Sequence, residues 1–410
     1  MEQWNIIKAY DYCYNVTDGT HDSPKQTEFG KYLITSKHIK DNRIDFESAY
    51  KISEDDYNKI ITRSKVDQWD IIISMIGAYC GFCCIESSKQ TDYAIKNVGL
   101  LKVGNELKCK WLYYYLTSPH GKQQLSKLRS GSSQPYISLG ALRNLDIPVP
   151  NENTMSDIVS VLSSLDSKIE LNRRINDNLE QQAQALFKSW FVDFEPFKDG
   201  KFVESELGMI PKGWRVGTLN EIGNVVGGGT PSKSKPEYYC SDGIAWITPK
   251  DLSILKAKFI FNGEIDITEL GYKNSSAKIM PKGSILFSSR APIGYIAIAQ
   301  NDITTNQGFK SVIPKKAGTA FIYLYLKENV DNIESQATGS TFKEASGSLM
   351  KAQKVVIPSG HIYDDFENLL QPIFKKQANL EIECRNLSTI RNTLLPKLMS
   401  GKLKINNLTR

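Results

Sequence analysis

The chain has 410 residues, of which 40% are apolar and 23% are charged. This composition is typical of globular proteins, excludes a collagen-like or wholly disordered chain, and suffices for two or three domains. The 51 Lys and Arg residues exceed the 45 Asp and Glu residues and give a net charge of +6. An excess of this size permits an anionic partner such as DNA without requiring one.

The sequence predicts a cytoplasmic protein without a membrane span. Its first residues include Glu2, Lys8 and Asp11 and do not form a charged-then-apolar export segment. The longest apolar stretch, 69–85, contains Asp70 and two glycines, which favours buried strands over a transmembrane helix. Seven cysteines, an odd number in a long chain, fit a reducing compartment.

The two halves of the sequence resemble each other. Residues 178–187 match 386–395 with an unbroken offset of 208 residues. The aromatic segments 111–116 and 321–326 match at an offset of 210. Such a repeat indicates two related structural units, and small changes of offset are what loop insertions produce. Each half is therefore predicted to be a mixed α/β unit followed by a long helix.

These observations predict an α+β fold with an internal pseudo-twofold repeat. The predicted divisions are a first mixed α/β unit over 1–150, a first long helix over 151–194, a Pro- and Gly-containing linker over 195–213, a second unit over 214–358, and a second long helix with a tail over 359–410.

Both predicted helices carry apolar residues that alternate by three and four, the pattern of a coiled-coil seam. A helix packed only on its own globular unit would instead show a broader apolar stripe. The predicted seam residues are Ile158, Leu162, Leu165, Ile169, Leu179, Leu186, Phe366, Leu370, Ile373, Leu380, Leu387 and Leu394. The polar residues Asn172, Asn176, Gln377 and Arg391 interrupt this seam.

Pro372 and Pro396 lie inside the second helical pattern. Since proline lacks a backbone donor and clashes with the preceding turn, we expect a kink or a late start, with a continuous helix only from about residue 372 to 395. The sequence favours an antiparallel pair, because a parallel pair would crowd both globular units at one end. It does not determine the register of the pair.

Two similar but non-identical units that are related by an approximate twofold axis and held a fixed distance apart are suited to bind two half-sites on duplex DNA. A helix of about 33 residues spans roughly 50 Å, or about fifteen base pairs. We therefore expect two different half-sites that are separated by base pairs that are not read.

Glycine-containing polar loops are the predicted DNA contacts, because polar side chains can read base edges and backbone can approach phosphates closely. Each loop could equally be a surface turn. The candidates in the first half are Thr20, His21, Lys25, Lys37, Arg129, Ser132, Ser133, Gln134 and Tyr136. Those in the second half are Thr230, Ser232, Lys233, Lys235, Lys250, Arg290, Ser340, Thr341 and Lys343.

Different roles are expected within this set. Arg290 corresponds to Gly77 in the repeat, so we expect it to make a contact specific to the second half-site. Lys233, Lys235 and Lys343 are better suited to phosphates than to bases.

Two further clusters are predicted to be structural. Cys80, Cys83 and Cys84 correspond in the repeat to Ile293, Ile296 and Ala297, which favours a buried apolar strand over a metal site. The aromatic segment 111–116 is expected to be core packing within a helix. Trp190 and Phe191 could contact a partner subunit or pack against the second unit.

With these residues in view, the chain resembles the specificity subunit of type I restriction-modification systems. The resemblance rests on residues 18–25 with 32–35, on 227–232 with 246–248, and on the helix endings 186–191 and 394–398. It covers nearly the whole chain, and the doubled order of globular unit then helix is more specific than any single motif.

The resemblance implies two target-recognition domains, an antiparallel coiled coil, and bipartite target sites in double-stranded DNA. It also implies assembly with two methyltransferase subunits and, in the restriction complex, with translocating endonuclease subunits. The family subunit has no catalysis and binds no cofactor itself; S-adenosylmethionine, ATP and Mg are implied for its partners.

Missing motifs agree with a non-catalytic chain. The sequence has no glycine-rich cofactor loop with an Asn/Asp-Pro-Pro-aromatic run, and no nucleotide-binding loop that ends Gly-Lys-Ser/Thr. The only Glu-x-Lys is 106–108, and four histidines offer little material for metal or triad chemistry. Two alternatives remain: a coiled-coil scaffold for protein partners, and a fused DNA-modifying enzyme with unrecognised catalytic motifs.

Overall fold

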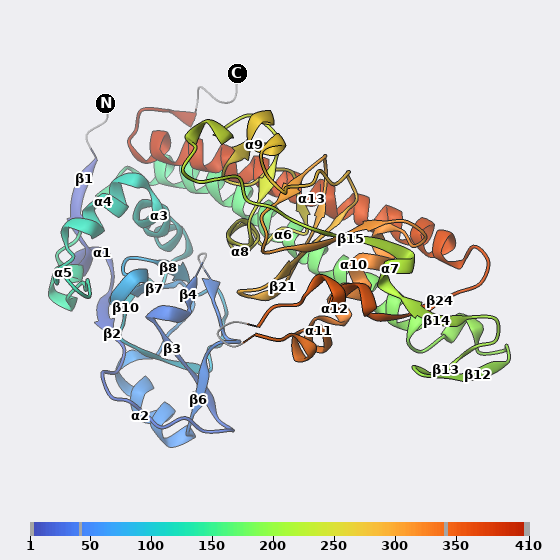
Figure 1. The fold of residues 1–410 in the computed structure, drawn as a ribbon. Helices are drawn as coiled ribbons and strands as arrows, with labels where there is room; N and C mark the ends of the chain where they lie inside the picture. Colours follow the sequence, from blue (N-terminus) through green and yellow to red (C-terminus); the bar gives the residue numbers. More distant parts are fainter. Residues whose placement is uncertain (1–3, 41–42, 340–342, 406–410) are drawn as a thin grey trace. The chain divides into compact units, whose positions relative to one another are not determined.

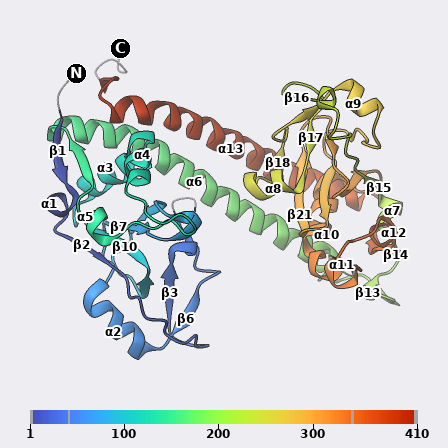
Figure 2. The same cartoon turned by 60° about the vertical axis from the view of Figure 1, so that its left-hand side comes forward.

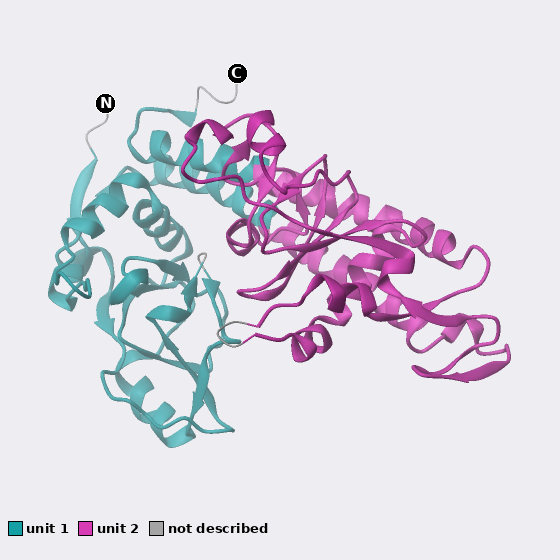
Figure 3. Ribbon diagram, in the orientation of Figure 1, with its two compact units in different colours: residues 1–169, 386–410 teal, residues 170–385 magenta. Residues whose placement is uncertain are grey.

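The computed structural model describes residues 4–40, 43–339 and 343–405 (Figure 1). The chain divides into two compact units, Met1–Ile169 with Asn386–Arg410, and Glu170–Arg385 (Figure 3). Each unit therefore contains a segment of both long helices, whereas the sequence-based division separates the helices from the globular parts. None of the described helices is long and apolar enough to cross a membrane.

Unit 1 is built on a four-stranded antiparallel sheet in the order β2-β10-β7-β8. Its central strands β10 and β7 are buried over their whole length. The strands of this sheet are β2 Asn15–Asp18, β10 Val98–Lys102, β7 Asp70–Ser74 and β8 Cys83–Ile85. The other strands of unit 1 are β1 Asn5–Lys8, β3 Lys31–Thr35, β4 Ile39–Lys40, β5 Arg43–Ile44, β6 Tyr50–Ile52, β9 Tyr93–Lys96 and β11 Asp146–Val149.

Short helices complete unit 1 and cover its sheets. Capping side chains begin several of them; for example, the Ser53 hydroxyl accepts from the amide of Asp56 at the start of α2. The helices are α1 Ala9–Tyr12, α2 Glu54–Ser64, α3 Glu106–Thr117, α4 Pro119–Lys127 and α5 Leu139–Arg143, with 3-10 turns η1 Ser36–His38 and η2 Gly77–Tyr79.

Unit 2 has a corresponding five-stranded sheet in the order β15-β23-β20-β21-β18. The strands of unit 2 are β12 Phe202–Ser205, β13 Gly208–Pro211, β14 Arg215–Thr218, β15 Gly223–Gly227, β16 Tyr239–Cys240, β17 Trp246–Ile247, β18 Phe259–Ile260, β19 Asp266–Ile267, β20 Ile285–Ser289, β21 Ile293–Ala299, β22 Thr304–Thr305, β23 Lys310–Pro314 and β24 Lys354–Ile357. Its helices are α7 Leu219–Ile222, α8 Pro249–Leu255, α9 Glu269–Lys273, α10 Thr319–Glu328, α11 Val330–Gln336 and α12 Gly347–Ala352, with 3-10 turns η3 Glu195–Phe197 and η4 Pro236–Tyr238.

The two units repeat the same strand pairings. The antiparallel order β2-β10-β7-β8 recurs as β15-β23-β20-β21, and the antiparallel pair β1-β11 recurs as β14-β24. The parallel pair β3-β9 recurs as β17-β22. The α+β class and the doubled order of elements predicted from the sequence are therefore confirmed.

The strand registers agree with the predicted repeat at Cys83 and Cys84. Ile71 pairs with Leu101 and Ile85, as Ile285 pairs with Val312 and Ile298, so Cys84 corresponds to Ala297 and Cys83 to Ile296. Cys80 follows η2 and lies outside the strand that was expected to hold it. All three thiols of the Cys80, Cys83 and Cys84 cluster are buried.

The long helices are α6, Glu152–Phe191, and α13, Ile362–Met399. The predicted late start of the second helix and its restriction to residues 372–395 are wrong, because α13 begins ten residues before Pro372 and continues past Pro396. The carbonyls that lose a partner belong to Asn368 and Asn392, four residues before each proline, and both are exposed residues to which water has access.

Within each unit, α6 and α13 pack antiparallel (Figure 2). In unit 1, Asp166 forms an ion pair of 2.7 Å with Arg391. In unit 2, Asn172 Nδ2 donates to Glu383 Oε2 at 2.8 Å. The Phe187 and Phe366 rings lie 6.3 Å apart. As the residue number rises along α6, the partner's number falls along α13, so the contacts fix the register that the sequence left open.

The predicted seam residues lie in this helical contact or beside it. Ile158, Leu162, Ile169, Phe366, Leu370 and Leu380 are buried, and Leu165, Leu179, Leu186, Ile373, Leu387 and Leu394 are half-buried. The helices also pack more broadly than a two-helix seam does, because both α6 and α13 contribute buried residues to the core of unit 1 and to the core of unit 2.

The end of α6 packs into the core of unit 2. The Phe191 ring lies 4.7 Å from Phe321 and 4.9 Å from Phe366, and Trp190 lies 5.5 Å from Phe366. Of the two alternatives for Trp190 and Phe191, the structure therefore supports packing against the second unit. The aromatic segment of α3 is also core: Trp111 and Tyr115 are almost completely buried.

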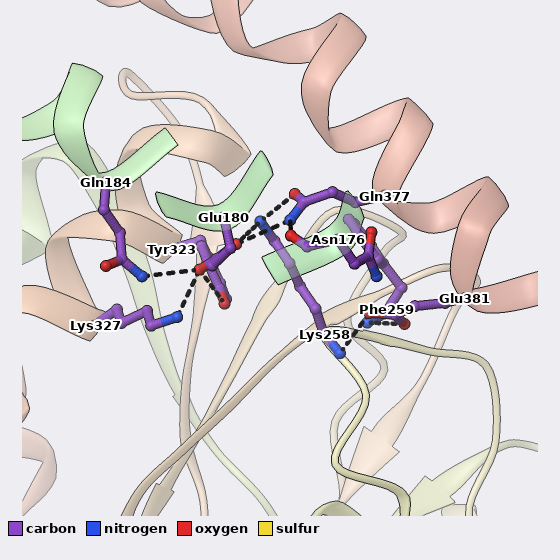
Figure 4. A network of polar contacts seen from close by, with 9 residues as sticks. All are labelled: Asn176, Glu180, Gln184, Lys258, Phe259, Tyr323, Lys327, Gln377 and Glu381. Carbon is purple, nitrogen blue, oxygen red and sulfur yellow. Dashed lines mark hydrogen bonds and ion pairs between the residues drawn. The ribbon is translucent and has the colours of Figure 1, made fainter. Parts of the chain in front are cut away.

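A buried polar network joins the two helices to the sheet of unit 2 (Figure 4). Glu180 on α6 receives ion pairs from Lys258 at 2.7 Å and from Lys327 at 2.6 Å. Gln377 on α13 accepts from Lys258 Nζ at 2.7 Å and donates to Glu180 at 3.1 Å. The amides of Lys258 and Phe259 donate to the Glu381 carboxylate.

The charges of this network depend on one another. Burial alone would raise the pKa of Glu180, but Lys258 and Lys327 outweigh burial and bring its pKa down to about 2. Burial lowers the pKa of Lys258 to about 8, against the opposing effect of Glu180. Glu180 therefore stabilises the fold when it is ionised, and removing its charge takes away the ion-pair partner of both Lys258 and Lys327.

We expect Glu180→Gln to destabilise unit 2 by about 3–5 kcal/mol, the cost of breaking a buried ion pair from one side. Adding Lys258→Met should recover part of the loss, because the stranded charge is removed. Urea denaturation followed by tryptophan fluorescence measures both effects, with the exposed Asp177→Asn on the same helix as control. Equal midpoints for Glu180→Gln and Asp177→Asn would contradict this role.

The same variant should change the acid dependence of stability. A folded-state pKa of about 2 lies below the usual value of 4.5, so the contribution of Glu180 is complete above about pH 4.5 and is lost as the pH falls towards 2. In this window the free energy of unfolding of Glu180→Gln should fall less steeply than that of the wild type.

Pro372→Ala should stabilise the protein by up to about 3 kcal/mol, because alanine restores a helical hydrogen bond in the interior of α13 and removes the clash with the preceding turn. The thermal midpoint measures the effect, and the exposed Lys375→Ala on the same helix is the control. A lower midpoint for Pro372→Ala would show that the proline is required by its surroundings.

Candidate nucleic-acid interface

In unit 1, strand direction brings several predicted loops to one edge of the sheets. Strands β2 and β7 run in the same direction, because both pair antiparallel with β10. Asp18 lies opposite Gly99 and Ser74 opposite Val98, so β2 and β7 end beside the start of β10. The parallel strands β3 and β9 also end near this edge, which we call reading edge 1.

Hydrogen bonds join the loops of reading edge 1. The amide of Thr20 donates to the carbonyl of Ile95 at 3.0 Å, and the Ser36 hydroxyl donates to the carbonyl of Asn97 at 3.0 Å. The amide of Gly77 donates to the carbonyl of Pro135 at 2.8 Å. The structure thus brings the loop after β2, the turn after β3 and the loop at 129–136 to one side of unit 1.

Asp18 organises the charged groups at this edge. Its carboxylate accepts from Arg63 Nη2 at 2.6 Å, and its other oxygen lies 3.1 Å from His21 Nε2. The Asp18 side chain is only 10% exposed, whereas the His21 side chain is 68% exposed. The buried carboxylate therefore holds an imidazole that faces solvent.

Unit 2 has an equivalent edge, reading edge 2, where β15, β17, β20 and β22 end and β23 begins. Gly227 lies opposite Lys310, and Ile247 lies beside Thr305. This edge contains a cleft of about 630 Å³. The cleft is lined by Thr230, Lys233, Tyr239, Trp246, Thr248, Pro249, Lys250, Asp251, Glu264, Ile265, Arg290, Ala291, Asn306, Gln307 and Gly308.

The loop after β15 is held firmly against the cleft wall. Trp246 Nε1 donates to the carbonyl of Gly229 at 3.0 Å, and the Tyr239 hydroxyl donates to the carbonyl of Pro231 at 2.6 Å. A Cβ at Gly228 would lie 1.9 Å from the carbonyl oxygen of Asn306, so only glycine permits this approach. Gly19 makes the equivalent approach in unit 1, where a Cβ would lie 2.4 Å from the carbonyl oxygen of Ile95.

Several polar groups of the cleft already bond within the chain. The Asp251 carboxylate accepts from the amides of Thr248 and Glu264 and from the Thr248 hydroxyl. Lys250 pairs with Glu264 at 2.6 Å, and this carboxylate raises the pKa of Lys250 above its usual value. These hydrogen bonds and this ion pair stabilise the shape of the cleft and leave the groups less able to bind a ligand.

Arg290, Lys233 and Gln307 keep hydrogen-bonding capacity for a ligand. Among the described residues, the Arg290 side chain makes one ion-pair contact, a long one of 3.7 Å to Glu344, and it is 38% exposed. Glu344 is closer to Lys310, at 3.1 Å. Lys233 is exposed and forms no ion pair with another residue in the described part of the chain.

The described candidates for DNA contact all lie at the surface or are half-buried. In unit 1, the exposed ones are His21, Lys25, Lys37, Arg129, Ser132, Ser133, Gln134 and Tyr136, and Thr20 is half-buried. In unit 2, Ser232, Lys233, Lys235, Lys250 and Lys343 are exposed, and Thr230 and Arg290 are half-buried. Ser340 and Thr341 lie outside the described residues.

Some candidates have structural contacts that limit a direct role. Arg129 Nη2 donates to the carbonyl of Cys80 at 2.5 Å and so supports the turn after η2. Lys235 lies 5.2 Å from the centre of the Tyr238 ring, and this tyrosine raises the pKa of Lys235. Lys25, Lys37 and Lys233 make no such contact with the other described residues.

Three further polar residues at these edges, Asn97, Asn306 and Gln307, were not predicted from the sequence. Asn97 is the single residue between β9 and β10, and Asn306 and Gln307 lie in the turn between β22 and β23. The signal that could have found them is polar amide residues in the short turn that leads into a strand of the central sheet. No group of three or more metal-ligating side chains occurs among the residues that the structure places.

The sequence of the chain is similar to those of known proteins. A model of the type I restriction modification DNA specificity domain matches residues 2–181 and 211–383. The chain is 41% identical over 203 residues to the type I restriction enzyme MjaIX specificity subunit of Methanocaldococcus jannaschii, which covers 47% of this chain and 46% of the relative. This match thus spans less than half the length of that relative.

A second relative is matched over more of its length. The type I restriction enzyme HindI specificity subunit of Haemophilus influenzae is 29% identical over 342 residues, which covers 68% of this chain and 74% of the relative. Among solved structures, the S subunit of a type I restriction-modification system from M. genitalium aligns with a TM-score of 0.54 and 18% identity over 96% of both chains, and so shares the fold.

The resemblance inferred from the sequence is confirmed by the family match, which covers both halves of the repeat. The chain belongs to the family defined by the type I restriction modification DNA specificity domain.

Proposed function

We propose that the chain is the DNA-recognition subunit of a type I restriction-modification complex and reads a bipartite, asymmetric target with an unread spacer. The observation that carries this proposal is the presence of two reading edges, each formed by the ends of equivalent strands, in one chain of this family. Because the side chains at the two edges differ, the two half-sites should differ in sequence.

The electrostatics of the two edges suit a polyanion. Lys25 and Lys37 at reading edge 1, and Lys233 at reading edge 2, are exposed. Exposed lysines neutralise phosphates, while base edges are read by arginine, amide and hydroxyl side chains. Each edge offers both kinds of group on loops that are held by backbone hydrogen bonds.

In this proposal, the chain is not itself an enzyme and binds no cofactor. Methyl transfer is carried out by two methyltransferase subunits, and cleavage by endonuclease and translocase subunits when these are present. The partners, not this chain, would use S-adenosylmethionine, ATP and Mg. The cytoplasm is the compartment in which these partners and chromosomal DNA meet.

The helices are expected to set the length of the unread spacer. Inserting one heptad into α6 after Ile169 and one into α13 after Arg385 keeps the seam in phase and adds about 10 Å, or about three base pairs. Mapping methylated adenines in cells that express the variant with its methyltransferase partner should show a longer spacer between unchanged half-sites. A heptad in only one helix is the control and should abolish methylation.

Changed half-site sequences with an unchanged spacer would overturn the spacer role of the helices. Absence of any sequence-specific methylation by the wild-type complex would overturn the proposed function itself.

Lys233 is expected to contact phosphate. Lys233→Ala should weaken binding of the assembled complex to all duplexes alike and reduce the slope of log K against log salt concentration by about one. Titration of labelled duplex DNA at several salt concentrations measures the slope. Lys315→Ala is the matched control, because this exposed lysine follows β23 at the end away from reading edge 2. Equal slopes for both variants would contradict the phosphate contact.

A further inference from the structure

Each reading edge holds one amide side chain in the same way. In unit 2, the Thr230 hydroxyl donates to Gln307 Oε1. In unit 1, His21 Nδ1 lies 3.0 Å from Asn97 Oδ1. Thr230 and His21 both belong to the loop that follows the first strand of the central sheet, and Gln307 and Asn97 both precede its neighbouring strand.

The backbone around the two amides is equivalent as well. The amide of Gly229 donates to the carbonyl of Thr305 at 2.8 Å, as the amide of Thr20 donates to the carbonyl of Ile95 at 3.0 Å. The arrangement thus recurs in two units whose sequences differ widely at these positions. Because a glutamine and an asparagine occupy the equivalent place, what recurs is the amide group and not the residue.

Each contact leaves part of the amide free for a ligand. A carboxamide oxygen has two lone pairs and its nitrogen two donors, so the bond to Thr230 or His21 leaves one acceptor site and the amino group. Gln307 is exposed in the cleft, and Asn97 is half-buried. Within the part of the chain that the structure describes, neither amino group has a hydrogen-bond partner.

The neighbours of Gln307 place it among groups suited to DNA. Arg290 and Lys233 line the same cleft. The adjoining Asn306 is less free, because its Oδ1 accepts from the amide of Gly308 at 2.9 Å and so shapes the turn. A carboxamide that is held in place and keeps one donor and one acceptor matches the N7 acceptor and N6 donor of adenine in the major groove.

We infer that Gln307 and Asn97 are equivalent specificity-determining residues, each of which reads one adenine in the half-site of its own unit. The inference rests on the proposed function and makes it specific. Thr230 and His21 are positioning residues in this scheme, since they hold the amide oxygens and fix the direction of the amino groups.

The decisive variant is Gln307→Glu. A carboxylate keeps the size of the side chain and still accepts from Thr230, so the loop remains held, but it loses the amino donor. Glutamate accepts from the N4 amino group of cytosine and cannot donate to N7 of adenine. The variant should therefore exchange adenine for cytosine at one position of one half-site, with a change in preference on the order of 10- to 100-fold.

The experiment uses the full chain assembled with its methyltransferase subunits and a pool of duplexes with randomised sequence. Bound duplexes are sequenced for the wild type, Gln307→Glu and Asn97→Asp. Asn97→Asp should change one position in the other half-site. Gln300→Glu is the matched control, because this amide follows β21 at the opposite end of the sheet and should leave every position unchanged.

The outcomes separate the inference from the proposed function. If the wild type selects no sequence, the proposed function fails. If the wild type selects a bipartite site and Gln307→Glu selects the same bases, the inference alone fails. Uniformly weaker binding by Gln307→Glu with no change at any base would assign the amide a purely structural role and would also overturn the inference.

Discussion

The buried carboxylate of Glu180 is the interaction on which the organisation of unit 2 depends. It is the meeting point of α6, α13, α10 and the segment that leads into β18, through Lys258, Lys327 and Gln377. A buried charge is tolerated only when its partners are correctly placed, so this network penalises any other arrangement of the helices against the sheet. The apolar seam alone would allow several registers, because leucines and isoleucines can pack in many ways.

Polar residues within the helical contact act together to define one register. Asn172 is buried and donates to Glu383, while Asp166 pairs with Arg391 in unit 1. A single polar residue in a coiled-coil seam is known to fix register at some cost in stability. Here, such residues occur in both units, which means that each unit sets the alignment of its own helical segments.

Much of this organisation could be predicted from the sequence, because a repeat and a heptad pattern are periodic signals. The doubled units, the long helices and the loops at 20–25 and 227–235 are all visible in this way. The outcome at Pro372 was not predictable, since proline ends a helix only when its freed carbonyl lacks a substitute partner, and exposure at Asn368 depends on the tertiary structure.

The amides at the reading edges escaped prediction for a different reason. Asn97 and Gln307 lie in turns of different length and composition, so no motif connects them in the sequence. Their equivalence is visible only through the backbone bonds that tie each turn to the loop after the first strand. Which of the other residues proposed to contact DNA lie close together likewise depends on which strands end at the same edge of a sheet.

The close approach of Gly19 and Gly228 to neighbouring carbonyls has a consequence for how such a chain can diverge. Several supports of each edge are hydrogen bonds between backbone atoms, which do not depend on the identity of nearby side chains. Residues in the supported turns can therefore be exchanged during evolution without loss of folding. A lineage could acquire a new target sequence through a few substitutions in one turn, while the other half of its target and its assembly with partners stay as they were.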